Sequence, residues 1–326
     1  MKRYTLVLAV ILIVLSLLVT GVDWLTEFNP FRHLEMSLLA SSTPGILDNW
    51  EPFQKVLKKI SDQNLIPSLT SQRFNILILG IDARDAEGSR ADVIMVANVN
   101  PVLKEISLVS IPRDTRIAVA GIGYTKINHT HFLGEREGGN AKGTQATLLA
   151  VATLLHCRLN YYIKVDFQGF EDFIDSLGGL DIELPQAVKF TFRSKATLPA
   201  GKNHLNGEMT LELTRERYSL KNGDFGRQQN QLRILKSIAK QVLNSITIPQ
   251  LYQFIVRERK DVVDTNLTNV DLISLAWLMR QMTERNLRYY QIRGKSEYAI
   301  DPLTKTTVYY WQPDMEDISR IQRHFR

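Results

Sequence analysis

The spacing of apolar residues predicts a domain in which β-strands alternate with α-helices. Residues 74–79 form a nearly unbroken apolar run that ends at Gly80, which is typical of a central strand buried on both faces. Residues 93–99 and 106–111 predict two more strands, and Asn100 begins the short turn between them. We therefore expect these two strands to form a hairpin, which makes the sheet mixed.

The middle of the chain continues the alternation with longer helical patterns. Strands are expected over residues 161–165 and 180–184, and helices over 144–156, 167–177, 207–213 and 226–243. Two stretches rich in glycine, histidine or other polar residues favour loops, 121–139 and 186–204. Because strands alternate with helices, the predicted fold class is α/β, with three layers (α/β/α) around a mixed central sheet.

The pattern weakens beyond residue 246. We expect a helix over residues 270–282 and edge strands over 288–292 and 308–311. Residues 73–246 are accordingly predicted to form the main domain. Residues 247–326 are predicted to be a C-terminal extension of unknown role that packs on it.

The first 22 residues have the pattern of a membrane segment. Lys2 and Arg3 precede an uncharged apolar run over residues 4–22, close to the ~20 residues that cross a bilayer as a helix. Because basic residues stay on the cytoplasmic side, we predict a single-pass signal-anchor in the cell membrane, with a cytoplasmic N-terminus and an extracytoplasmic domain. A cleaved signal peptide is the alternative, and it exports the same domain. Residues 23–72 are predicted to form a stem.

Composition and charge narrow the class of partner. The chain has 326 residues, 44% hydrophobic and 23% charged, which fits a globular protein rather than a disordered or fibrous one. Its net charge of +6 and pI near 9.3 favour anionic partners, but a nucleic acid does not suit an exported domain. The single cysteine, Cys157, excludes an intrachain disulfide and is interpreted as a small buried apolar residue. His129 and His131 lack the neighbouring ligands that a zinc site needs.

Arginines and aspartates recur where the predicted strands begin or end. They are Asp82 and Arg84 after the first strand, Arg90 and Asp92 before the second, and Arg113 and Asp114 after the third. If the first two strands are antiparallel neighbours, these side chains gather at one edge of the sheet. Fixed cations beside carboxylates suggest a pocket for a phosphate or pyrophosphate with a divalent metal. Structural salt bridges on a solvated rim are the alternative, which we would favour for any single pair.

Further cations lie at the ends of two predicted helices. Arg215 and Arg217 are two residues apart, and they share a face if the chain is extended beyond Arg215. Arg227 and Gln231 lie on one face near the start of the next helix, where anions are favoured. All four side chains are therefore candidates for binding the same anion.

At these residues the chain resembles the LytR-CpsA-Psr family of cell-wall phosphotransferases. The Ile-Pro-Arg-Asp-Thr stretch at 111–115 and the Asp-Phe-Gly-Arg stretch at 224–227 make the resemblance specific. The order and spacing fit from about residue 74 to 243, in segments 75–84, 90–93, 109–115, 126–128, 165–170, 177–182, 205–208, 215–217 and 223–227. The chain departs from the family at Asn230 and Leu232, where Arg and Gln are usual, and at Ala91, where Ser or Thr is common.

The resemblance implies a function and a distribution of roles. Family members are thought to transfer a glycopolymer from a polyprenyl-pyrophosphate carrier in the membrane to peptidoglycan or another wall acceptor. By resemblance, Asp82 and Asp92 would hold Mg²⁺ or Mn²⁺, and Asp82, Arg90 and Arg113 would lie closest to the chemistry. The residues expected to bind the pyrophosphate are Arg84, Arg90, Arg113, Arg215, Arg217, Arg227 and Gln231. The alternatives are a polyprenyl-pyrophosphate phosphatase that uses water as acceptor, and a non-catalytic binder of carrier lipid or wall polymer.

Overall fold

The computed structural model describes residues 73–82, 89–245, 263–268, 271–272, 275 and 284–325. All of them belong to one compact unit, Ser71–Arg326. The predicted signal-anchor and stem lie outside the described residues, as does most of the predicted helix over 270–282. Among the helices that are described, none combines the length and the low polarity that crossing a membrane requires.

A mixed sheet of six strands, in the order β11-β6-β1-β2-β3-β12, forms the centre of this unit. The strands are β1 (Phe74–Asp82), β2 (Arg90–Asn100), β3 (Glu105–Ser110), β6 (Tyr161–Asp166), β11 (Val263–Thr265) and β12 (Leu287–Gln291). β1 runs antiparallel to β2 and parallel to β6, and β2 and β3 form the predicted hairpin. The prediction of a mixed central sheet is therefore confirmed.

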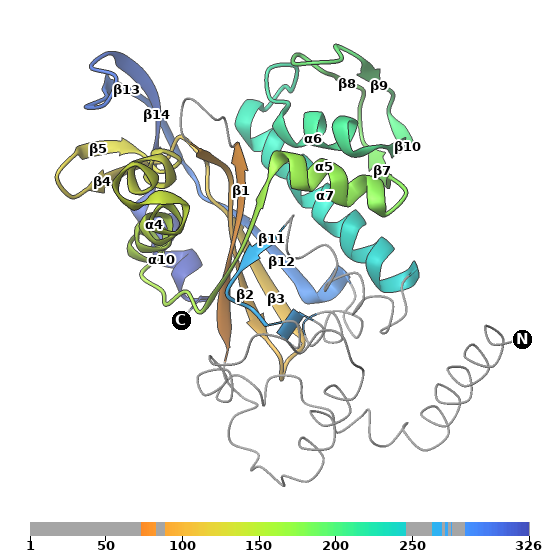
Figure 1. The fold of residues 1–326 in the computed structure, drawn as a ribbon, viewed down its shortest axis with the longest axis horizontal. Helices are drawn as coiled ribbons and strands as arrows, with labels where there is room; N and C mark the ends of the chain where they lie inside the picture. Colours follow the sequence, from red (N-terminus) through yellow and green to blue (C-terminus); the bar gives the residue numbers. More distant parts are fainter. Residues whose placement is uncertain are drawn as a thin grey trace, which may run out of the picture. The chain divides into compact units, whose positions relative to one another are not determined.

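Helices cover both faces of the sheet (Figure 1). α4 (His129–Leu155) and α10 (Met315–Gln322) lie on one face, and α5 (Phe167–Ser176), α6 (Gly207–Arg215) and α7 (Gly223–Ser245) lie on the other. Leu77, Leu79 and Ile81 of β1 share a core with the helices of the first face. Because side chains alternate along a strand, Ile78 and Asp82 point to the face that α7 covers. The candidate site residue Asp82 therefore lies on the α5–α7 side.

Four short two-stranded sheets surround the central sheet. Two of them pack with α5, α6 and α7: β7 (Leu180–Leu184) with β10 (Gly201–Leu205), and β8 (Val188–Lys189) with β9 (Thr197–Leu198). The other two are β4 (Arg116–Val119) with β5 (Gly123–Lys126), and β13 (Gly294–Ile300) with β14 (Thr307–Pro313). A 3₁₀ turn, η3 (Glu284–Asn286), leads into β12.

The prediction of a loop over residues 121–139 is wrong, because β5 and the start of α4 lie within it. α4 begins at His129 and is broken at Gly138 and Gly139. Its two halves approach so closely that a Cβ on Gly134 would lie 2.6 Å from the carbonyl oxygen of Lys142. The glycines that suggested a loop instead allow two helical segments to pack against each other.

The C-terminal residues complete the central sheet. β12 pairs in parallel with β3, and β11 pairs with β6, so both outer strands come from beyond residue 246. α10 contributes Ile318 and Ile321 to the core under α4. The described structure therefore does not divide at residue 246, because hydrogen bonds tie the last part of the chain into the sheet. The predicted strand over 308–311 lies within β14, which pairs with β13 rather than with the central sheet.

Gly80 in β1 leaves room for Val93 of β2, and this contact can be tested. A Cβ at position 80 would lie 2.9 Å from Cβ of Val93, so Gly80→Ala is expected to lower the free energy of unfolding by about 1–3 kcal/mol. Gly138→Ala is the control, because its backbone is extended (φ −166°) and its Cβ would meet the flexible Lys142 side chain. Urea denaturation measures the free energy of unfolding of both variants. Equal stability of the two would contradict the close contact between Gly80 and Val93.

Candidate active site

A β-bulge sets the position of Asp92. Asp82 pairs with Arg90 across β1 and β2, but Gly80 pairs with Val93 and Ile81 with Ala91. Asp92 is therefore the extra residue of β2. Bulges interrupt strand alternation and change the direction in which a side chain points. Asp82, Arg90 and Asp92 consequently lie at one end of the β1–β2 pair, as the sequence predicts.

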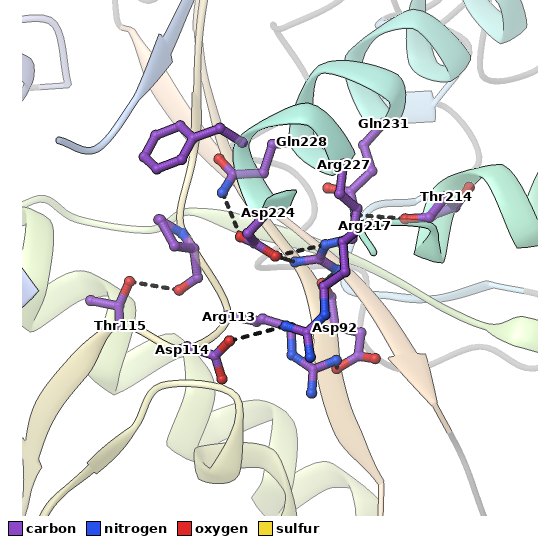
Figure 2. Close-up of polar contacts among 12 residues, drawn as sticks. Asp92, Arg113, Asp114, Thr115, Thr214, Arg217, Asp224, Arg227, Gln228 and Gln231 are labelled. Atoms are coloured by element: carbon purple, nitrogen blue, oxygen red, sulfur yellow. Dashed lines mark hydrogen bonds and ion pairs between the residues drawn. The ribbon is translucent and has the colours of Figure 1, made fainter. Parts of the chain in front are cut away.

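The turn after β3 brings Arg113 to Asp92. The backbone N–H and the hydroxyl of Thr115 both donate to the carbonyl of Pro112, at 2.9 and 2.6 Å, and close the turn. Arg113 Nη1 then lies 2.5 Å from Asp92 Oδ1 (Figure 2). Among the described residues, this Oδ1 and Arg113 Nε are buried without an aligned hydrogen bond. The pair is thus a close contact of charges that leaves bonding capacity for a ligand.

Asp114 collects the neighbouring cations. Its Oδ1 lies 2.7 Å from Lys126 Nζ, and its Oδ2 lies 3.4 Å from Arg217 Nη1. Burial alone would raise the pKa of Asp114, but Lys126, Arg113 and Arg217 together lower it below its usual value. Asp114 is therefore ionised and holds the cations in place.

A buried glutamate separates Arg215 from Arg217. Glu216 follows the end of α6 with an extended backbone and accepts hydrogen bonds from Thr191 and from the N–H of Ser219. With Glu216 anchored inside, the two flanking arginines point to the site, as the extended-segment prediction requires. Arg215 Nη2 reaches Asp82 Oδ2 at 3.5 Å.

Arg215 is also held by two aromatic rings. Its guanidinium carbon lies 4.8 Å from the ring centre of Phe167 and 5.0 Å from that of Phe192. These cation–π contacts fix the orientation of the guanidinium without using its hydrogen-bond donors. Apart from the long contact of Nη2 with Asp82, the rings therefore leave the donors to an anion.

Arg227 and Gln231 attach α7 to the rest of the site (Figure 2). Arg227 is 3% exposed; its Nη1 donates to the carbonyl of Asp92 at 2.8 Å, while Nε and Nη2 contact Asp224 Oδ1 at 2.9 and 2.8 Å. Gln231 Nε2 donates to the carbonyl of Thr214 at 3.1 Å. Both side chains thus join α7 to neighbouring elements, and their direct contact with a pyrophosphate stays a prediction.

The departures at positions 230 and 232 have different surroundings. Leu232 packs with Met95 and Ala97 under the sheet, so an apolar residue suits this position. Asn230 is buried and accepts a hydrogen bond from Arg233, while its Nδ2 has no partner among the described residues. Neither side chain supplies the cation that the family usually has in this helix.

The remaining predicted cations are Arg90 and Arg84. Arg90 is exposed at the end of β2, opposite Asp82. Arg84 lies outside the described residues. The site that the structure brings together therefore consists of Asp82, Arg90, Asp92, Arg113, Asp114, Lys126, Arg215, Arg217, Asp224, Arg227 and Gln231.

The protein side chains at this site supply only some of the ligands that a divalent cation needs. Asp82 and Asp92 offer carboxylate oxygens, the ligand type that Mg²⁺ prefers, and Asp92 Oδ1 lacks an aligned hydrogen bond. The described residues contain no group of three or more acidic, histidine or cysteine side chains placed to hold a metal. Mg²⁺ commonly binds through one or two carboxylates together with phosphate oxygens and water, and this site suits that mode.

Several residues that the structure places at the site were not predicted from the sequence. Lys126 holds Asp114, Phe167 and Phe192 hold Arg215, and Glu216 anchors the segment between the arginines. The pattern of arginines and aspartates in the sequence gives no signal for aromatic rings from distant elements. Lys126 could have been found, because it begins one of the segments that fit the family, 126–128.

The fold and the site define a protein that gathers arginines and carboxylates at one edge of a mixed sheet, the arrangement expected for binding a phosphorylated ligand. A model of the LytR_cpsA_psr family matches residues 49–326. The chain belongs to the LytR-CpsA-Psr family, which confirms the resemblance seen in the sequence.

Known relatives share this fold. The polyisoprenyl-teichoic acid–peptidoglycan teichoic acid transferase TagU of Bacillus subtilis (strain 168) is 28% identical, and the match covers 100% of this chain and 96% of that protein. TagU of Bacillus cereus (strain ATCC 14579) is 31% identical, with 75% of each chain covered. The transferase TagV of Bacillus subtilis is 28% identical over 80% of this chain and 66% of that protein. The crystal structure of Bacillus subtilis TagV superposes with a TM-score of 0.66 at 28% identity, covering 78% of this chain and 96% of that chain.

The ion pairs of Asp114 lead to a prediction of pH-dependent stability. Asp114→Asn is expected to lower the free energy of unfolding at pH 7 by about 1–3 kcal/mol, because Lys126 and Arg217 lose their counter-charge. The folded pKa is lowered below the usual 3.8, so the stability that the carboxylate contributes is complete above pH 3.8 and is lost as the pH falls through the folded pKa. Urea denaturation of wild type and variant at pH 7 and at about pH 2 measures this difference. A difference that persists at the lower pH would contradict it.

Proposed function

We propose that this protein is a membrane-anchored, exported phosphotransferase that moves a glycopolymer from a polyprenyl-pyrophosphate carrier to a cell-wall acceptor such as peptidoglycan. The observation that carries the proposal is the convergence of arginines on carboxylates that hold them loosely. Arg215–Asp82 and Arg217–Asp114 are separated by 3.5 and 3.4 Å, longer than the 2.7–2.9 Å of a strong charge-assisted hydrogen bond. Phosphate oxygens at the site would give these cations closer partners.

The chemistry follows from the arrangement of charge. Phosphoryl transfer depends on positioning and charge neutralisation more than on covalent participation by the protein. Arg113, Arg215 and Arg217 would bind the pyrophosphate oxygens and stabilise the negative charge that develops on the departing polyprenyl phosphate. A Mg²⁺ or Mn²⁺ bound by Asp82 and Asp92 would add positive charge beside the same oxygens.

The relatives support the choice of donor and acceptor. TagU and TagV are named as transferases of polyisoprenyl-linked teichoic acid to peptidoglycan, and TagU matches this chain along its whole length. The proposed anchor rests on the basic residues and the apolar run over 4–22. With the domain outside the cell, carrier lipid in the membrane and peptidoglycan are both within its reach.

Arg113 is the first residue to test. Arg113→Ala is expected to slow transfer by about 10²–10³-fold, the scale of losing one fixed electrostatic donor. The assay measures polymer transfer from a short-chain polyprenyl-pyrophosphoryl saccharide to uncross-linked peptidoglycan. Arg288→Ala is the control, because Arg288 forms an exposed ion pair with Glu105. Transfer by Arg113→Ala at the wild-type rate would overturn its role, and free phosphorylated saccharide as the only wild-type product would indicate a phosphatase.

The metal requirement gives a second test. Chelation with EDTA is expected to stop transfer, and Mg²⁺ or Mn²⁺ should restore it, since the remaining ligands come from phosphate and water. Asp82→Asn should weaken metal binding measured by titration calorimetry in the presence of inorganic pyrophosphate. Asp181→Asn serves as the control, because Asp181 is a surface residue paired with His204. Full activity of the wild type in EDTA would exclude the metal role.

A further inference from the structure

A buried chain of hydrogen bonds connects the last part of the sequence to His129. Asp301 lies between β13 and β14 and is 0% exposed. Its Oδ2 accepts hydrogen bonds from the hydroxyls of Thr125 at 2.9 Å and Tyr310 at 2.6 Å. Thr125 Oγ1 in turn lies 2.8 Å from His129 Nδ1. Two segments far apart in the sequence, 125–129 and 301–310, thus join to hold one imidazole ring.

This series of hydrogen bonds determines which nitrogen of His129 carries the proton. Burial alone would raise the pKa of Asp301, but hydrogen bonds, above all that of Tyr310, lower it, so the carboxyl is ionised and can only accept. The single hydroxyl proton of Thr125 therefore goes to Asp301. Thr125 Oγ1 must accept from His129 Nδ1–H, which leaves Nε2 of the neutral ring with a free lone pair.

His129 lies beside the anion site. It directly follows Asn128, whose N–H donates to the carbonyl of Arg113 and whose carbonyl accepts from the N–H of Ala91. Ala91 stands between Arg90 and Asp92 on β2. The ring is 12% exposed, so it is fixed by its surroundings without being closed off from solvent. The segment that carries the ring is therefore hydrogen-bonded to β2 and to the turn after β3, which both supply residues of the site.

We propose that His129 is the general base of the transfer reaction, with Nε2 taking the proton of the attacking acceptor hydroxyl and with Thr125 and Asp301 as positioning residues. This role rests on the proposed function. The acceptor oxygen forms a bond to the phosphorus that carries the polymer, and the bond from that phosphorus to the bridging oxygen breaks. The electron pair of that bond leaves with the polyprenyl phosphate. The hydroxyl proton moves to Nε2, and the resulting imidazolium later releases it to solvent.

The charges around the ring agree with this role. Burial, with Arg90 and Lys126, lowers the pKa of His129 to about 4, although Asp301 and Asp114 act in the opposite direction. The ring is therefore neutral and able to accept a proton at neutral pH. Binding of a pyrophosphate to Arg90 would offset one of the cations that disfavour the protonated ring, while Asp301 remains to stabilise it.

The alternative is that the hydrogen bonds from Asp301 through Thr125 to His129 serve only the stability of the fold. The backbone N–H groups of Leu303 and Thr304 donate to Asp301 Oδ1, so Asp301 also shapes the turn between β13 and β14. A structural role predicts that changes here affect stability and donor binding together. A base predicts loss of turnover with donor binding preserved.

The tautomer can be measured without any assay of activity. In wild-type protein labelled with ¹⁵N-histidine, NMR should show His129 protonated at Nδ1 and unprotonated at Nε2, with His129→Gln assigning the signal. In Asp301→Asn, the backbone N–H groups at Oδ1 force the new amide NH₂ toward Thr125. Thr125 then donates to His129 Nδ1, and the proton of the ring should move to Nε2. An Nε2–H tautomer in the wild type would overturn the proposal.

Kinetics then test the base itself, with the full chain and a short-chain polyprenyl-pyrophosphoryl N-acetylglucosamine donor. His129→Gln is expected to lower kcat by at least ~100-fold while KM and donor binding change by less than about threefold. Asp301→Asn should lower kcat similarly, whereas Tyr310→Phe, which keeps the Thr125–Asp301 bond, should retain most activity. His204→Gln is the control, because His204 is an exposed histidine paired with Asp181.

The outcomes separate this role from the proposed function. Transfer by the wild type and by His129→Gln at equal rates would overturn the base and leave the transferase function intact. If His129→Gln lost both donor binding and turnover, His129 would have a structural role. A wild-type protein that binds the donor but transfers nothing to peptidoglycan would overturn both.

Discussion

Asp92 is held from two sides by arginines of different elements, and the site depends on this connection. The bulge in β2 turns its carboxylate toward Arg113, at 2.5 Å, while its backbone carbonyl accepts from Arg227 of α7 at 2.8 Å. Arg227 is in turn fixed by Asp224. β2, the turn after β3 and α7 are thereby joined at a single residue, and each brings its own charged side chains to the same edge.

The balance of charge explains why so many cations can lie close together. Asp114 neutralises Lys126 and Arg217, and Asp82 lies near Arg215, so the arginines are partly compensated in the protein itself. Lys126 and Arg227 make short contacts with Asp114 and Asp224, and these contacts shape the site. Arg215 and Arg217 make long contacts, so their carboxylate partners are too far away to saturate them. Arg113 lies 2.5 Å from Asp92, but its Nε is buried without a hydrogen bond to any described residue and keeps a donor for a ligand.

The C-terminal part of the chain has two roles that its weak apolar periodicity does not indicate. β11 and β12 close the edges of the central sheet, and α10 covers one of its faces. Asp301, in the turn between β13 and β14, accepts hydrogen bonds from Tyr310 of β14 and from Thr125, and Thr125 contacts His129. The same segment that completes the fold therefore orients a ring next to the anion site.

The sequence by itself determined the central strands β1, β2 and β3, the helix end at Arg215 and the meeting of Asp82, Arg90 and Arg113 at one sheet edge. Each follows from local apolar periodicity and from where the runs stop. Only the tertiary structure decided the bulge at Asp92, the aromatic rings around Arg215 and the link from Asp301 to His129. It also showed that the glycines of 121–139 serve helix packing. These features depend on register and on contacts between residues distant in the chain, which local periodicity does not encode.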